Sequence, residues 1–162
     1  SAVTGFFTSV YKDCKPIITI IEPNEAACIF KTIKANDNKL HPVTTDMNSI
    51  MAGLACGEPI TIGIDILRSY GDNFISCPDY VAANGMRVLS SPIETDSRII
   101  AGESGAAGFG AFYEIMSNEK ISYAKEELKL NEDSVILFFN TEGATDQKSY
   151  DDIVWNGAYS RQ

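Results

Sequence analysis

The sequence has few of the features that mark membrane, nucleic-acid-binding or secreted proteins. No stretch approaches the roughly 18 consecutive apolar residues of a membrane-spanning helix, and the apolar start Ser1–Phe7 has no cationic segment before it, unlike a signal peptide. Basic residues number 13 against 22 acidic ones, and a formal net charge of −9 repels polyphosphates. We therefore expect no membrane segment, no nucleic-acid partner and a cytoplasmic location.

Histidine and paired cysteines are also scarce. The four cysteines form no CxxC pair, and the one histidine, His41, has no cysteine or acidic cluster at metal-ligand spacing. We predict no metal site, and we interpret the cysteines as small hydrophobic residues kept reduced in the cytosol. His41 lies in a polar segment over 35–46 that we predict to be a loop, and no Gly-x-Ser-x-Gly elbow is present for a nucleophilic triad. The His41 ring is expected to be solvated.

What the chain does have is an alternation of strand-like and helix-like segments. The continuous apolar runs Ile17–Ile21 and Ser134–Phe139 are typical of strands buried on both faces, as in a parallel sheet. Asn73–Cys77 and Arg98–Ala101 are shorter strand candidates. Helices are predicted over residues 2–11, 25–34, 46–52, 61–70, 80–89, 104–116, 122–128 and 147–155. The alternation predicts an α/β fold, three-layered, with a mainly parallel sheet.

Polar residues follow three of the predicted strands, where ligands gather in parallel sheets, and at the later two they lie beside glycine. They occur at Glu22, over 101–106 and over 139–146. In the second segment we expect Ser104 to cap the following helix, while its glycines permit close approach of a backbone or a flat ligand. Glu103 needs a hydrogen-bonding or cationic partner, because a buried unpaired carboxylate is costly. Both later segments also fit plain capped helices, so these residues alone leave the chemistry open.

Several segments, in matching order and spacing, together resemble the diaminopropionate ammonia-lyases: Thr45–Pro59, Asn73–Cys77, Gly85–Leu89, Arg98–Ala106, Asn140–Asp146 and Ile153–Gly157. The resemblance extends over nearly the whole chain. It implies a fold-type-II pyridoxal-phosphate enzyme, related to threonine dehydratases and serine racemases. Such an enzyme converts 2,3-diaminopropionate to pyruvate and ammonia by α,β-elimination, with the cofactor ring as electron sink.

The same resemblance implies that residues 1–162 form the carboxy-terminal part of such a lyase. The family's Schiff-base lysine, the acidic residues that handle the amino groups and the phosphate-binding glycine loop would lie upstream. None of the chain's lysines lies in the family's lysine motif, so no catalytic residue is assigned, and the chain alone is expected to be inactive. Family members commonly pair, which implies a homodimer of the full-length enzyme acting on a small amino acid.

Four residues are expected to line the cofactor pocket. By position, Thr141 resembles the hydroxyl residue that faces the pyridine nitrogen in related dehydratases, and Ser104 is its rival for that role. A hydroxyl there leaves the ring nitrogen less protonated than a carboxylate would. Glu103 and the backbone at Gly53 are expected to line the same pocket.

Three questions stay open on the sequence. The chain also fits a non-catalytic α/β module for binding or assembly, and a threonine dehydratase-like enzyme would use the same cofactor. Cys28 and Cys56 flank the loop at 35–46, so they could form a disulfide that tethers it, or they could remain free thiols.

Overall fold

The computed structural model describes residues 1–161, which divide into two compact units. The N-unit comprises Ser1–Ser49 and Leu54–Ser76. The C-unit comprises Ile50–Gly53 and the residues from Cys77 onward.

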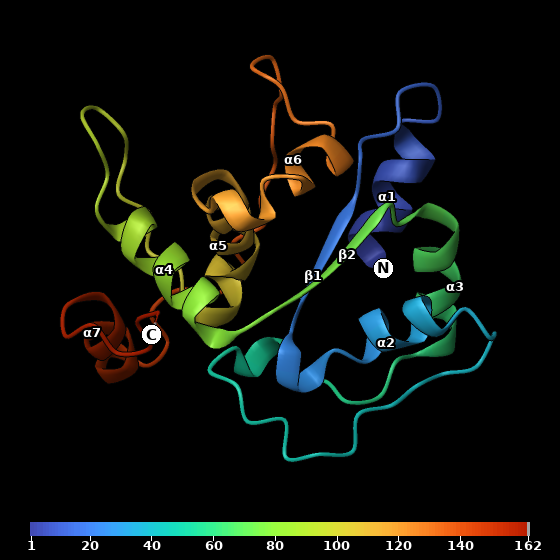
Figure 1. The fold of residues 1–162 in the computed structure, drawn as a ribbon, viewed down its shortest axis with the longest axis horizontal. Coiled ribbons are helices and arrows are strands. Elements are labelled where there is room, and N and C mark those ends of the chain that lie inside the picture. Colours follow the sequence, from blue (N-terminus) through green and yellow to red (C-terminus); the bar gives the residue numbers. More distant parts are fainter. Residues whose placement is uncertain (162) are drawn as a thin grey trace. The chain divides into compact units, whose positions relative to one another are not determined.

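The N-unit contains the two strands of the described chain, paired in one small sheet (Figure 1). Its elements are α1 (Ala2–Val10), β1 (Thr19–Pro23), the 3-10 turn η1 (Asn24–Ala26), α2 (Cys28–Ala35), α3 (Thr61–Tyr70) and β2 (Asn73–Cys77), whose last residue belongs to the C-unit. The amides of Asp72 and Asn73 both donate to the carbonyl of Ile18, at 2.9 and 3.1 Å. Both strands therefore start at the same end and run parallel, which confirms the predicted α/β class.

A buried carboxylate joins β1 to α2. Both oxygens of Glu22 accept backbone hydrogen bonds from the first turn of the helix, from Ile29 at 3.0 Å and from Phe30 at 2.7 Å. Burial nevertheless raises the pKa of Glu22, because desolvation outweighs these two bonds and the thiol of Cys28. The helix predicted over 25–34 is consequently split: η1 ends at Ala26, and α2 begins at Cys28, where the carboxylate meets its free N–H groups.

The C-unit is helical, with its core between α4 (Asp79–Ser90), α5 (Glu103–Ser117) and α7 (Gln147–Val154). The 3-10 turn η2 (Ala52–Leu54) begins in this unit, and η3 (Glu119–Ile121) and α6 (Ala124–Glu127) follow α5 (Figure 1). Buried side chains from all three large helices and from the segment before α5 form the core: Ala83, Met86, Ala101, Ala106, Tyr150 and Ile153. The side chain of Asp146 caps α7, because its carboxylate accepts from the amide of Ser149 at 3.1 Å.

Helices α4 and α5 touch backbone to backbone at two glycines. A methyl group at Gly85 would lie 2.7 Å from the carbonyl oxygen of Ala106, and one at Gly110 would overlap the carbonyl oxygen of Val81. Only glycine fits at these two positions, because real Cβ contacts are not that short and the obstacle is rigid backbone. The abundance of small residues in the predicted helix over 104–116 therefore reflects tight helix packing.

Three predictions about secondary structure are wrong. Ser134–Phe139 forms no strand and is largely exposed, with Val135 98% and Leu137 63% exposed. The run needs strands on both sides to pair its backbone, and β1 and β2 are the only strands among residues 1–161. Arg98–Ala101 likewise has no strand partner and is irregular, and the helix expected over 46–52 is reduced to η2.

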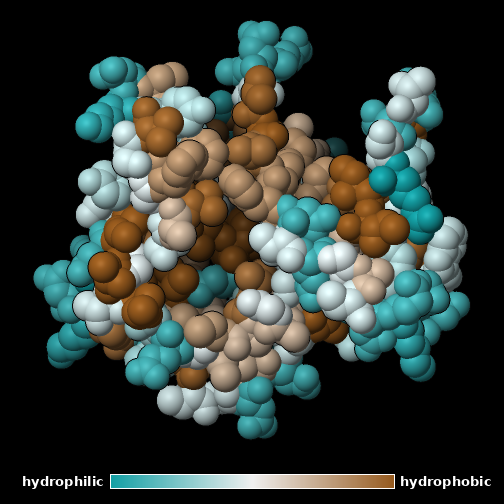
Figure 2. Space-filling model, turned by 180° about the vertical axis from the view of Figure 1, so that it is seen from behind, coloured by the Kyte–Doolittle hydropathy of each residue, from teal (hydrophilic) through white to brown (hydrophobic). Residues whose placement is uncertain are grey.

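Apolar side chains reach the surface in both units (Figure 2). In the N-unit Phe6 and Ile62 are more than half exposed, and in the C-unit so is Trp155. None of the helices within residues 1–161 is long and apolar enough to cross a membrane.

Replacing Gly110 by Ala should lower the free energy of unfolding by about 1–3 kcal/mol, because the new methyl group pushes α5 away from α4. The matched control is Gly108→Ala in the same helix, where the methyl group would lie 3.6 Å from the ring of Phe138, an ordinary contact. Alanine's higher helix propensity should make that variant neutral or more stable by up to about 1 kcal/mol. Urea unfolding of both variants measures the difference, and equal stabilities would contradict the backbone contact.

Candidate functional site

Three segments of the C-unit meet at the first turn of α5. The amide of Gly53 donates to Ser104 Oγ at 2.9 Å. From the other side, the amide of Ser104 donates to Glu142 Oε2 and the amide of Gly102 to the Glu142 carbonyl, at 2.9 and 2.8 Å. The structure thus brings Gly53 and Ser104 together with the turn that contains Thr141. We call this meeting of 50–53, 100–105 and 140–145 the α5 junction.

Ser104 does not cap α5, contrary to the prediction. The helix begins one residue earlier, at Glu103, and its N-cap is Gly102, which has no side chain to donate or accept. The carboxylate of Glu142, 38 residues further along the chain, accepts from the free N–H of Ser104 instead. The hydroxyl of Ser104 is therefore released from capping and binds the amide of Gly53.

Glu103 has the hydrogen-bonding partner that its carboxylate was expected to need. Ser149 Oγ, in α7, donates to Glu103 Oε1 at 2.6 Å, and the Glu103 side chain is half-buried. This bond directs the carboxylate toward α7. Its place in the lining of a pocket stays a prediction.

Thr141 presents a free hydroxyl at the junction. It is exposed, and it has no hydrogen bond to any residue from 1 to 161. Its two neighbours are both held: Asn140 Nδ2 donates to the carbonyl of Ile100 at 3.0 Å, and Glu142 binds the helix start. The backbone at Thr141 is therefore held in place on both sides, while its hydroxyl makes no hydrogen bond within residues 1–161.

The glycines of the α5 junction allow neighbouring segments to pack closely against the start of the helix. A methyl group at Gly102 would lie 2.5 Å from the carbonyl of Gly143, and one at Gly105 would lie 2.7 Å from the carbonyl of Glu142. The sequence left open whether a backbone or a flat ligand approaches these glycines. At these two positions it is the turn 140–145, through its carbonyls and the side chains of Asn140 and Glu142.

Glu142 is the residue of this site that the sequence analysis does not single out. It appears there only as one member of a polar segment after a predicted strand. The available indication was chemical: a carboxylate close to one glycine and two hydroxyl residues needs hydrogen-bond donors. Which donors it meets depends on the fold, because the Ser104 amide and the Thr145 hydroxyl come from different segments, the latter at 3.4 Å from Oε1.

The N-unit holds a second polar cluster around Cys28. The buried Cys28 thiol donates to the carbonyl oxygen of Cys56 at 3.1 Å, and it lies 3.8 Å from Glu22 Oε1. Cys28 and Cys56 do come close together, as the sequence suggested, but both are free thiols in the structure, so the disulfide is not formed there. Burial, and then the charge of Glu22, raise the pKa of Cys28 to about 11.

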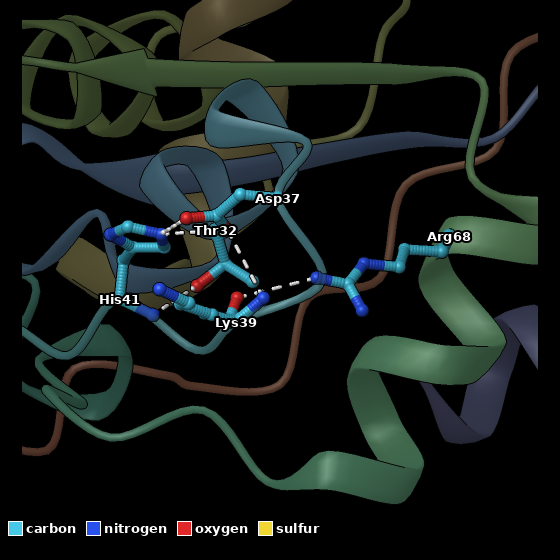
Figure 3. Close-up of polar contacts among 5 residues, drawn as sticks. All are labelled: Thr32, Asp37, Lys39, His41 and Arg68. Carbon is cyan, nitrogen blue, oxygen red and sulfur yellow. Dashed lines mark hydrogen bonds and ion pairs between the residues drawn. The ribbon is translucent and has the colours of Figure 1, made fainter.

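The loop between α2 and η2 carries the chain's histidine (Figure 3). The predicted loop is confirmed as irregular, but His41 is only partly exposed, and its Nε2 lies 3.0 Å from Asp37 Oδ1. The backbone amide of His41 donates to the buried Thr32 hydroxyl at 2.9 Å, and Arg68 Nη2 donates to the carbonyl of Lys39 at 3.3 Å. Two of these bonds hold the start of the loop against α2 and α3, and the third, between His41 and Asp37, lies within the loop. The hydrogen bond from His41 lowers the pKa of Asp37.

No group of three or more histidine, cysteine or acidic side chains within the described chain is arranged to hold a metal ion.

Alkylation with iodoacetamide at pH 8 should separate the cysteines. With a pKa of about 11, only about one in a thousand Cys28 thiols is ionised at that pH, and burial raises the pKa of Cys77 still further, to about 12. The exposed Cys14 and Cys56 should be labelled first, which peptide mass spectrometry measures. Glu22→Gln removes one cause of the shift and should speed labelling of Cys28 but not of Cys77. Equal rates at Cys14 and Cys28 in the parent protein would refute the shielded thiol.

Replacing His41 by Ala should raise the pKa of Asp37 toward its ordinary value, as followed by a carboxyl NMR titration. Because the folded-state pKa is lowered, the stabilising contribution of Asp37 is present above its unfolded pKa and is lost as pH falls through its folded pKa. His41→Ala should remove this contribution. The control is Lys39→Ala, which keeps the backbone bond from Lys39 to Asp37 and should leave the titration unchanged.

Comparison with known proteins identifies the chain's relatives, although no family model matches it. A curated diaminopropionate ammonia-lyase of Escherichia coli (strain K12) is 44% identical over 158 residues, which are 98% of this chain and 39% of the relative. The solved structure of diaminopropionate ammonia-lyase from Escherichia coli in complex with an aminoacrylate-PLP azomethine reaction intermediate has a TM-score of 0.77 and 44% identity, over 88% of this chain and 35% of that one.

A more distant solved structure, a threonine deaminase of T.th., shows likeness of fold alone. It has a TM-score of 0.57 at 14% identity, over 68% of this chain and 38% of that one. The expected fold of the fold-type-II enzymes is confirmed by this likeness. The chain spans about two fifths of the length of the curated relative that it matches. With 44% identity over nearly all of its residues, the chain is related to the diaminopropionate ammonia-lyases.

Proposed function

We propose that the protein containing this chain is a pyridoxal-phosphate-dependent ammonia-lyase that converts 2,3-diaminopropionate to pyruvate and ammonia by α,β-elimination. The observation that carries the proposal is the 44% identity over 98% of the chain. Because the chain spans 39% of that relative, the activity is proposed for the whole protein. The proposal includes a cytoplasmic homodimer that binds a small amino acid, on the strength of the family resemblance.

Within that enzyme we assign the α5 junction to the wall of the cofactor pocket. The residues present fit a pyridine ring, whose nitrogen needs one hydrogen-bonding partner. Thr141 offers an exposed hydroxyl with no partner among residues 1–161. Ser104 is the second candidate: its oxygen accepts from Gly53, and its own hydrogen has no acceptor within the described chain. When bound, pyridoxal phosphate supplies the electron sink for the elimination.

The chemistry of this wall is set by a neutral hydroxyl at the ring nitrogen. A hydroxyl can donate or accept a hydrogen bond but does not give up its proton near neutral pH, so it does not protonate the ring. Glu103 is the carboxylate nearest in sequence to Ser104, and its Oε1 already accepts from Ser149 in α7. That bond supports the hydroxyl of Thr141 or Ser104, rather than Glu103, as the partner of the nitrogen.

The complete protein that contains this chain should release pyruvate from 2,3-diaminopropionate in a lactate dehydrogenase-coupled assay. Thr141→Val should lower kcat by about tenfold or more, while Thr141→Ser, which keeps the hydroxyl, should stay near the parent value. The 162-residue chain alone should release none, because no lysine in it lies in the family's lysine motif.

The same assay separates the alternatives. Loss of activity in Ser104→Ala but not in Thr141→Val would identify Ser104, and not Thr141, as the hydrogen-bonding partner of the ring nitrogen. Release of 2-oxobutanoate from threonine, with none of pyruvate from 2,3-diaminopropionate, would indicate a threonine dehydratase-like enzyme. A complete protein that binds no pyridoxal phosphate would favour a non-catalytic module.

A further inference from the structure

Glu142 is linked to both residues that could bind the ring nitrogen. Its Oε2 accepts a hydrogen bond from the amide of Ser104 at 2.9 Å, and it follows Thr141 directly in the sequence. The Glu142 carbonyl also accepts from the amide of Gly102 at 2.8 Å. Side chain and main chain of this one residue therefore fix the Thr141 turn to the start of α5.

The side chain of Glu142 packs closely against the backbone of Gly102, at the start of α5. A methyl group at Gly102 would lie 2.7 Å from its Cγ and 2.9 Å from its Cδ. The second oxygen, Oε1, lies 3.4 Å from the hydroxyl of Thr145, which closes the turn on itself. Within the turn 140–145, Glu142 thus makes two hydrogen bonds to the start of α5 and one to Thr145.

The charge of Glu142 suits this place. Helix α5 has 15 residues, and its first turn presents unpaired N–H groups and the positive end of the helix dipole. A carboxylate binds such N–H groups more strongly than a neutral amide does. The half-buried Glu142 side chain has only hydrogen-bond donors of the chain as partners, and no cation pairs with it among residues 1–161.

We propose that Glu142 is a positioning residue of the lyase. Its carboxylate, bound to the Ser104 amide, holds the Thr141 backbone in the place from which the Thr141 hydroxyl meets the cofactor's ring nitrogen. The inference rests on the proposed function, and it adds a residue that touches neither cofactor nor substrate. Glu142→Gln keeps the size of the side chain but lacks the charge and puts a donor where Thr145 or Ser104 now donates. The Thr141 hydroxyl should then lose its fixed place.

The test uses the complete protein with Glu142→Gln and Glu142→Asp. Glu142→Gln should lower kcat for 2,3-diaminopropionate by about tenfold to a hundredfold with KM changed less than about threefold, because misplacement of a reacting group acts mainly on the chemical step. It should also shift the visible absorption band of bound pyridoxal phosphate, which reports the environment of the ring. Glu142→Asp, which retains the charge, should recover part of kcat. The control is Glu132→Gln, an exposed carboxylate with no hydrogen bond to the described residues, which should match the parent.

Coupling to Thr141 separates positioning from general stability. If Glu142 acts through that hydroxyl, Glu142→Gln should change the absorption band and kcat little further in a Thr141→Val background. Fully additive effects on kcat and band, or a Glu142→Gln variant with the parent's kcat and spectrum, would overturn the proposal. If Glu142→Gln does not fold, Glu142→Asp in the same two backgrounds distinguishes coupled from additive effects in the same way. A parent protein that neither binds pyridoxal phosphate nor releases pyruvate would instead contradict the proposed function.

Discussion

The bond between a carboxylate and the free N–H groups of a helix start is the interaction on which both units depend. In the N-unit Glu22, near the end of β1, accepts from Ile29 and Phe30 in the first turn of α2. In the C-unit Glu142 accepts from Ser104, which ties a late turn to a helix 38 residues earlier. Each carboxylate satisfies donors that would otherwise lose their water partners on burial. The first bond is local, and the second fixes the candidate site.

This difference in range explains what the sequence could predict. Helix α3 and strand β2 have the predicted bounds, because helix periodicity and a short apolar run between turn residues are local properties. Ser134–Phe139 has the same kind of local pattern as β1 but is mostly exposed, with Phe138 resting its ring 5.6 Å from that of Phe109. A strand exists only where another strand pairs its backbone, and a run of apolar residues does not encode that partner.

The candidate site was predictable to the same extent. Residue type showed that Glu103 needs a partner and that the glycines near Ser104 admit a close neighbour, and the structure supplies Ser149 and the backbone of the 140–145 turn. The sequence could not show that Glu142, and not Ser104, supplies the side chain that binds a free N–H group of α5. That contact depends on the distance between two segments in the folded chain. Local rules place a serine at a helix start, and tertiary contacts decide which of its groups is used.

The free hydroxyl of Thr141 follows from the same arrangement. A side chain that must meet a ligand loses less entropy on binding when the backbone beneath it is already fixed. Asn140 is held by the carbonyl of Ile100 and Glu142 by the start of α5, so the residue between them has a fixed backbone and an unused oxygen. If the Thr141 hydroxyl bonded within the chain, the ligand would have to displace that bond. An anchored turn with one unpaired hydroxyl suits the role toward the ring nitrogen that we propose for Thr141, and the stabilising bonds lie on the two residues beside it.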